Sequence, residues 1–262
     1  MMLLLVVAGA AALVAPGARP PRAVVCGGAT YDYCVQALGC TMADASKVER
    51  SLMADMAKYM TYAKAEEKCV WLQSRLDLDE GQLRKIIIRQ PAVLGSSVEV
   101  NMAPKLDWLQ TCLDLNEAQL KKMVMTLPQL LGLSVEDNLA PTLEWLQRRL
   151  DLDPAELKNV LLGVPPLLGL SVDNMAPKLA YLEQEIGLSP AELRDWVVKN
   201  PTLLGRSLAN RYRPRLEACR AAGVDVKRVL SYATQTDETF CKCIGIEPGA
   251  LEAIRKQSVL SV

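Results

Sequence analysis

The sequence contains no histidine among its 262 residues. Histidine supplies the general base of Ser–His–Asp triads and many of the ligands of zinc sites, so such triads and His-ligated zinc sites are excluded. No Gly-rich phosphate loop and no Cys-x-x-Cys pair with zinc spacing is present either. We therefore expect a protein that is not an enzyme, with no metal, no cofactor and no small-molecule substrate.

Aromatic residues are also scarce, with one Phe and four Trp, whereas Leu, Ala and Met are common. This composition favours helices over sheets. The formal net charge is zero, so bulk charge alone does not indicate a nucleic-acid partner.

The chain opens with about fourteen apolar residues that end before Pro16, too few to span a bilayer comfortably. The small residues Ala10 and Ala12 within this run suit cleavage of a signal peptide after Ala12. The next stretch carries Arg19 and Arg22 and has no acidic residue before Asp32.

A signal-like segment followed by an acid-poor one resembles the two-part presequence of algae with secondary plastids. We assign residues 1–12 as signal-like and 13–40 as transit-like, and expect this presequence (1–40) to be disordered or removed. Residues 41–262 then form the folded domain, and the expected location is the plastid. The secretory pathway and the mitochondrion are the alternatives.

Three sequence marks recur with a period of 36 or 37 residues, which indicates a repeat protein. The first is the Pro of a Pro-x-x-Leu-Gly motif, the second is another Pro 12 or 13 residues later, and the third is an aromatic residue four residues after that. They stand at Pro91, Pro128, Pro165 and Pro201; Pro104, Pro141, Pro177 and Pro214; and Trp71, Trp108, Trp145 and Tyr181.

Each unit is predicted to hold two helices. The first runs from about Ser134 to Leu150 in the clearest unit, and the second begins with an N-cap residue, as at Asp153 or Ser189, followed three residues later by Glu or Gln. The second helix ends before Pro165, and a tight turn, one turn of 3₁₀ helix, follows, with Gly169 free to take a positive φ.

A single helix pair of this size cannot bury its apolar face, but stacked pairs can. We therefore predict an all-α solenoid of about five units, clear over 66–230, with degenerate caps at 41–65 and 231–262. The repeated Trp positions and Cys69 and Cys219 are assigned to the core, and the second Pro of each unit to a bend or late start of the first helix. Cys26, Cys34 and Cys40 could form a disulfide in an exported protein.

The motifs RQPAVLG, TLPQLLG, GVPPLLG and KNPTLLG, each followed by a Pro-x-Leu segment, resemble those of the mitochondrial transcription termination factor (mTERF) family. The resemblance covers residues 66–230. It implies two-helix repeats with a 3₁₀ turn, coiled into a half-doughnut, and binding of double-stranded nucleic acid along a basic concave groove. It also implies a role in organellar transcription or RNA maturation, without catalysis.

Two groups of basic residues are candidates for that groove. One residue per unit, directly after a recurring Leu of the second helix, is basic, which would lay a line of positive charge along the array. Residues 205–230 add a local excess of five positive charges. The candidates are Arg84, Lys121, Lys158, Arg194, Arg206, Arg211, Arg213, Arg215, Arg220, Lys227 and Arg228.

We expect a monomer that binds double-stranded DNA, with structured RNA as the alternative partner, and that regulates organellar transcription or its termination. Arg211, Arg213 and Arg215 are the first candidates for reading base edges. The alternative function is a protein-interaction scaffold that keeps the solenoid and has no nucleic-acid groove. These two functions differ in where the repeated basic residues lie.

Overall fold

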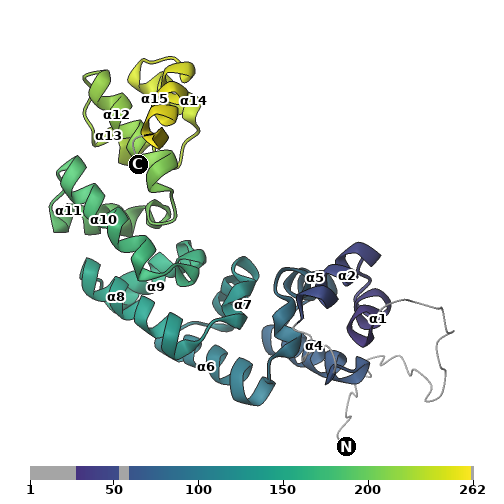
Figure 1. Cartoon of the computed structure of the whole chain (residues 1–262). Helices are drawn as coiled ribbons and strands as arrows, with labels where there is room; N and C mark the ends of the chain where they lie inside the picture. The colour runs from purple at the N-terminus through teal and green to yellow at the C-terminus, as the bar shows by residue number, and fades with distance from the viewer. Residues whose placement is uncertain (1–27, 53–58, 261–262) are drawn as a thin grey trace, which may run out of the picture.

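The computed structural model describes residues 28–52 and 59–260, and within those ranges the chain is helical and contains no strand. The all-α prediction is confirmed. The helices follow one another along a curved array from α1 at one end to α15 at the other, with α4 and α6 on the outer side of the curve and α5 and α7 on the inner side (Figure 1).

Each repeat consists of a first helix, a second helix and a 3₁₀ turn. The first helices are α4 (Tyr62–Leu76), α6 (Ala103–Cys112), α8 (Ala140–Leu150), α10 (Val172–Ile186) and α12 (Arg213–Ala221). The second helices are α5 (Glu80–Arg89), α7 (Glu117–Thr126), α9 (Pro154–Gly163), α11 (Pro190–Lys199) and the short α13 (Arg228–Ser231). The 3₁₀ turns are η1 (Pro91–Gly95), η3 (Pro128–Gly132), η5 (Pro165–Gly169) and η6 (Pro201–Leu203).

The predicted start of the second helix is confirmed in four repeats. Asp79, Asn116, Asp153 and Ser189 each accept a hydrogen bond from the backbone N–H three residues on, and the Gln or Glu there bonds back to the cap residue. This exchange satisfies two N–H groups that the first turn leaves unpaired. The helices end before Pro91, Pro128, Pro165 and Pro201, as predicted.

The second Pro of each unit produces a wide turn in three of the first helices. There the chain forms a π-helical turn, in which N–H groups bond five residues back; for example, the Met102 N–H reaches the Ser97 carbonyl at 3.0 Å. A Pro ring collides with the carbonyl four residues before it, and the wider turn avoids this collision. The α-helix therefore starts late, with Pro104 in its first turn, whereas Pro177 lies inside a continuous α10. The π-helical turns are η2 (Val98–Met102), η4 (Val135–Leu139) and η7 (Leu208–Tyr212).

The prediction of a positive φ at Gly169 is wrong. The chain leaves the 3₁₀ turn through an extended residue, Leu170 (φ −94°, ψ 138°), so no left-handed residue is needed there. The left-handed positions lie instead at the end of the first helices, where the helix must stop sharply. They are Asp77, Asp114 and Asp151, with φ of 48° or 49°, and Gly187 and Gly223.

Leucine side chains from both helices and from the 3₁₀ turns form one continuous core along the array. Cys69 and Cys219 are buried in it, as predicted, and Cys34 and Cys40 are buried free thiols. The repeated aromatic residues are half-buried against this core, which confirms their structural assignment. Cys26 lies outside the described residues.

The structure corrects the start of the folded domain. Residues 29–36, assigned to the presequence, form helix α1 (Ala29–Gln36), which packs on α2 (Met42–Ser51) and α4. Its Tyr33 and Cys34 are buried in the core. Because α1 stacks on α4 and α2 on α5, the pair extends the array by one unit. The signal-like segment lies outside the described residues.

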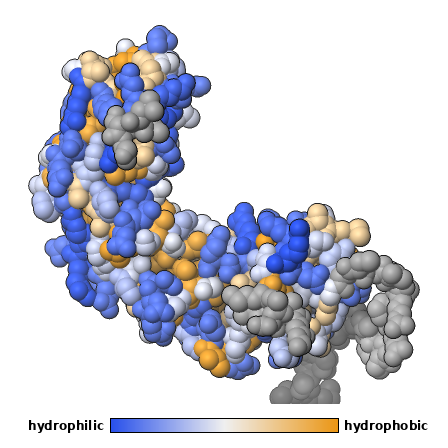
Figure 2. All heavy atoms as spheres, in the orientation of Figure 1, coloured by the Kyte–Doolittle hydropathy of each residue, from blue (hydrophilic) through white to orange (hydrophobic). Residues whose placement is uncertain are grey.

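The C-terminal cap consists of α14 (Asp237–Ile244) and α15 (Pro248–Leu260), which pack on each other and, through α15, on α12. The face of the array shown in Figure 2 is mostly polar, and apolar residues gather near its inner bend. Across the ranges 28–52 and 59–260, no helix is long and apolar enough to cross a membrane.

Candidate nucleic-acid interface

The basic residue repeated on the second helices bonds to the preceding repeat. Lys121 donates to the carbonyl of Asp77 and Lys158 to that of Asp114, and the Arg194 Nε donates to the Asp151 carbonyl at 3.0 Å. Asp77 and Asp151 are the C-cap residues of α4 and α8, and Asp114 directly follows the C-cap of α6. At this end a helix leaves its last carbonyls unpaired and carries partial negative charge. Each cation therefore caps the first helix of its neighbour.

The same bond recurs at both ends of the array in altered form. The Arg84 Nε donates to the Leu38 carbonyl after α1 at 2.5 Å, which identifies α1 as the first helix of the N-terminal unit. Lys227 instead pairs with Glu192 at 2.7 Å. This hydrogen bond, together with those from Ser189, lowers the pKa of the Glu192 carboxyl to about 2.

These bonds give the repeated basic position a structural role that accounts for its periodicity without nucleic acid. The position bridges neighbouring repeats, so its recurrence in the sequence is no longer by itself an argument for a phosphate-binding groove. Any nucleic-acid contact of these five side chains has to compete with the bonds they already make.

Two adjacent lysines on α7 separate the structural role from nucleic-acid binding. Lys121 bonds to the neighbouring repeat, whereas the amine of Lys122 is exposed and unpaired among the described residues. We expect Lys121→Met to lower the free energy of unfolding by about 1 kcal/mol, because a helix end loses its capping donor. Lys122→Met should leave stability within about 0.5 kcal/mol. Urea titration of both variants measures the difference, and equal stability would contradict the capping role.

The C-terminal arginines are mostly engaged inside the protein. Arg215 is completely buried; its guanidinium pairs with Asp237 at 2.6 Å, donates to the carbonyls of Tyr232 and Gln235, and stacks on Phe240. Arg211 donates to the carbonyls of Ala233 and Gln235. Arg215 therefore has no path to a base edge, which corrects its assignment as a candidate for base reading.

Asp237 is the shared acceptor of this cluster. Besides Arg215, it pairs with Arg255 at 2.6 Å and lies 3.5 Å from Arg211. Burial alone would raise the pKa of the Asp237 carboxyl, but hydrogen bonds from Arg215 and Arg255 outweigh it and lower that pKa. The cluster joins α12 to α14 and α15, so this part of the predicted basic patch is an internal salt-bridge network.

The remaining predicted residues divide into two groups. Arg220 pairs with Glu185 at 2.8 Å, and Arg228 donates to the Cys243 carbonyl. Arg213 lies over the ring of Tyr181, 5.9 Å from its centre, and the Arg206 Nε is buried with no hydrogen-bond partner. Of the predicted set, Arg206 and Arg213 are the two whose guanidinium groups no carboxylate or carbonyl of the described residues is recorded to hold.

A second set of interior cations was missed from the sequence. Lys68, Lys105 and Lys178 of the first helices donate to the carbonyls of Leu94, Leu131 and Leu204, which lie in or directly after the 3₁₀ turns, each 26 residues later. Burial lowers the pKa of all three amines. The signal available was a basic residue directly after the second Pro, as in Pro104-Lys105 and Pro177-Lys178, although Thr142 replaces it in one unit.

Five exposed cations on α2 and on the second helices have no hydrogen bond or ion pair with the described residues. We call them the unpaired cations, and they were not predicted as a group. They lie mostly in the N-terminal half, since the repeat positions of Lys85 and Arg89 are filled by Asn159 and Gly163 in α9. The unpaired cations are Lys47, Lys85, Arg89, Lys122 and Lys199.

A search of curated proteins found no match to this chain. A comparison with protein families matched residues 40–240 to the family described as mTERF. The matched stretch begins between α1 and α2, runs through the repeats from α4 to α13 and ends within α14. This chain belongs to the mTERF family.

Proposed function

We propose that this protein binds double-stranded nucleic acid in the plastid and regulates organellar transcription or its termination. The mTERF family consists of nucleic-acid-binding regulators of organellar gene expression, and membership of the chain supports the general role. The plastid location rests on the presequence pattern alone. Double-stranded DNA is the proposed partner, and structured RNA is the alternative.

The observation that carries the proposal is the presence of cations that the fold does not use. Most lysines and arginines of the repeats bond to carbonyls or carboxylates, yet the unpaired cations remain exposed on the neighbouring helices α2, α5 and α7 and, beyond α9, on α11. Exposed, unpaired charges can neutralise phosphates without breaking a protein contact. Arg206 and Arg213 lie nearer the C-terminus and are half-buried, so they are weaker candidates than the unpaired cations.

The salt dependence of binding tests the proposal. A mobility-shift titration with double-stranded DNA, double-stranded RNA and single-stranded RNA, each at several salt concentrations, gives the slope of log affinity against log salt. Five phosphate contacts predict a slope of about −4 to −5 on duplex DNA, because each contact contributes about −0.9. Absent or salt-independent binding to all three probes would refute the proposal.

The scaffold function remains the second candidate, and one observation favours it. The five repeated basic residues bond to neighbouring repeats, so the line of charge expected along the array is partly neutralised. A scaffold would bind a protein partner through the curved surface and show no salt-dependent affinity for duplexes. The same titration therefore separates the two candidates.

A further inference from the structure

A surface pocket of about 420 Å³ lies where the C-terminal ends of the second helices meet the 3₁₀ turns, at the N-terminal end of the array. Three successive units contribute to it, through α2, through α5 with η1, and through α7 with η3. Its lining residues are Lys47, Ser51, Ile88, Arg89, Pro91, Thr126, Pro128 and Gln129.

The chemistry of this pocket favours an anion. Its two charged lining residues, Lys47 and Arg89, are both unpaired cations, and none of the described residues that line it is a carboxylate. A larger pocket of about 750 Å³ beside Arg75 differs in this respect, because Arg75 there pairs with Glu117 at 2.8 Å and with Asp107 at 3.0 Å. The charges of the larger pocket are already neutralised, whereas those of the smaller one are not.

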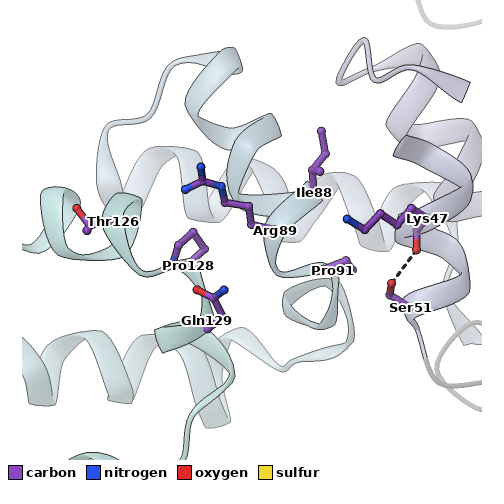
Figure 3. Close-up of a pocket in the computed structure, with 8 residues that line it drawn as sticks. All are labelled: Lys47, Ser51, Ile88, Arg89, Pro91, Thr126, Pro128 and Gln129. Atoms are coloured by element: carbon purple, nitrogen blue, oxygen red, sulfur yellow. Dashed lines mark hydrogen bonds between the residues drawn. The ribbon is translucent and has the colours of Figure 1, made fainter. Parts of the chain in front are cut away.

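The two cations extend into this pocket region from different helices. Figure 3 shows Lys47 extending from α2 toward α5, and Arg89 extending from the end of α5 toward α7. Figure 3 shows Pro91 below and between the two cations and Pro128 below Arg89, and these two prolines give the pocket apolar lining. Cations on successive helices match an anion with several charges along its length better than a single small ion.

We propose that the sugar–phosphate backbone of a nucleic-acid strand crosses the ends of α2, α5 and α7 in this pocket, with Lys47 and Arg89 on separate phosphates. This inference rests on the proposed function and gives it a place on the array. The strand meets cations on α2 and α5, and then Thr126 at the position on α7 that Arg89 occupies on α5.

The test measures the affinity of the full chain for duplex DNA after cations are removed from, or added to, these positions. Lys47→Gln combined with Arg89→Gln should weaken binding about tenfold at moderate salt and make the log–log salt slope shallower by about 2. Thr126 is exposed, so Thr126→Arg adds a third cation in register and should steepen the slope by about 1. Arg148→Gln is the matched control, because that side chain is 78% exposed on α8, away from the pocket.

The outcomes distinguish the two proposals. If the wild-type chain binds no duplex, the proposed function fails and this inference fails with it. If the wild type binds but the double variant behaves like Arg148→Gln, only the place of the strand is overturned. Inorganic phosphate is a second probe, besides duplex DNA. If phosphate binds saturably and requires Lys47 and Arg89, while neither residue affects duplex affinity, the pocket is an ion site and the inference is overturned. The Thr126→Arg variant tests the inference even if the variant that lacks Lys47 and Arg89 folds poorly.

Discussion

Replacing Asp237 with alanine should lower the free energy of unfolding of the C-terminal cap by about 3 kcal/mol, because it leaves a buried arginine without its counter-ion. Arg215 is fully buried, and Asp237 is its carboxylate partner at 2.6 Å. The two backbone carbonyls that also accept from Arg215 carry no full charge and compensate it only in part. The side chain of Asp237 is 34% exposed, which places the estimate at the lower end of the range for buried pairs.

Urea titration followed by hydrogen exchange at α12, α14 and α15 measures this loss, since repeat arrays can unfold locally. Glu144→Gln is the control, because its pair with Arg148 is exposed and is expected to contribute less than about 1 kcal/mol. Similar stability of the two variants would show that the cluster around Asp237 is not a stabilising network.

The pH dependence of this effect has a defined sign. The pKa of Asp237 in the folded state is lowered, so its contribution is complete above the unfolded value of about 4 and is lost as the pH falls through the folded value. The difference between wild type and Asp237→Ala should therefore be full at neutral pH and shrink below about pH 4. A difference that grows on acidification would contradict this assignment.

Replacing Lys105 with methionine should cost about 2 kcal/mol, because the carbonyl of Leu131 loses its charged donor while buried. Lys105 is 3% exposed, and its amine donates to Leu131 at 2.6 Å and to Asn101 at 2.9 Å. Methionine keeps most of the apolar stem, so the loss reports the hydrogen bonds rather than packing.

Lys105→Arg tests whether a charged donor suffices, and we expect it to recover part of the stability in the same urea titration. Lys122→Met is the exposed control on the next helix. If Lys105→Met is as stable as wild type, the carbonyl of Leu131 finds another partner, and the link between α6 and η3 is not needed.

The local parts of the fold could be predicted from the sequence. Capping boxes such as Asp153 with Glu156, and helix ends before Pro165, depend on residues within four positions of each other, so their signals are contiguous. The π-helical turn before Pro104 was not predicted, because a Pro early in a helix shows that a bond must be lost and not how the backbone compensates.

The candidate interface could be predicted less well. The sequence shows where Lys121 and Lys158 recur, but their partners are backbone carbonyls 44 residues earlier, and a carbonyl has no signature in the sequence. The burial of Arg215 could not be predicted for a similar reason, since only the packing of α12 with the C-terminal helices α14 and α15 shows it. The excess of positive charge over 205–230 can be counted from the sequence, but the solvent exposure of these arginines and lysines depends on tertiary contacts.

The bond from each second helix to the first helix of the preceding repeat also bears on how such an array can change length. Three successive units, from α4 to α9, carry both halves of this interaction, a carbonyl after the first helix as at Asp114 and a cation on the second helix as at Lys121. A copied unit of 37 residues, inserted in register, would therefore find its acceptor and its donor already in place on either side. Duplication or deletion of a whole unit leaves the bonds between the remaining units in place. The length of the array can therefore vary in evolution without redesign of its interfaces.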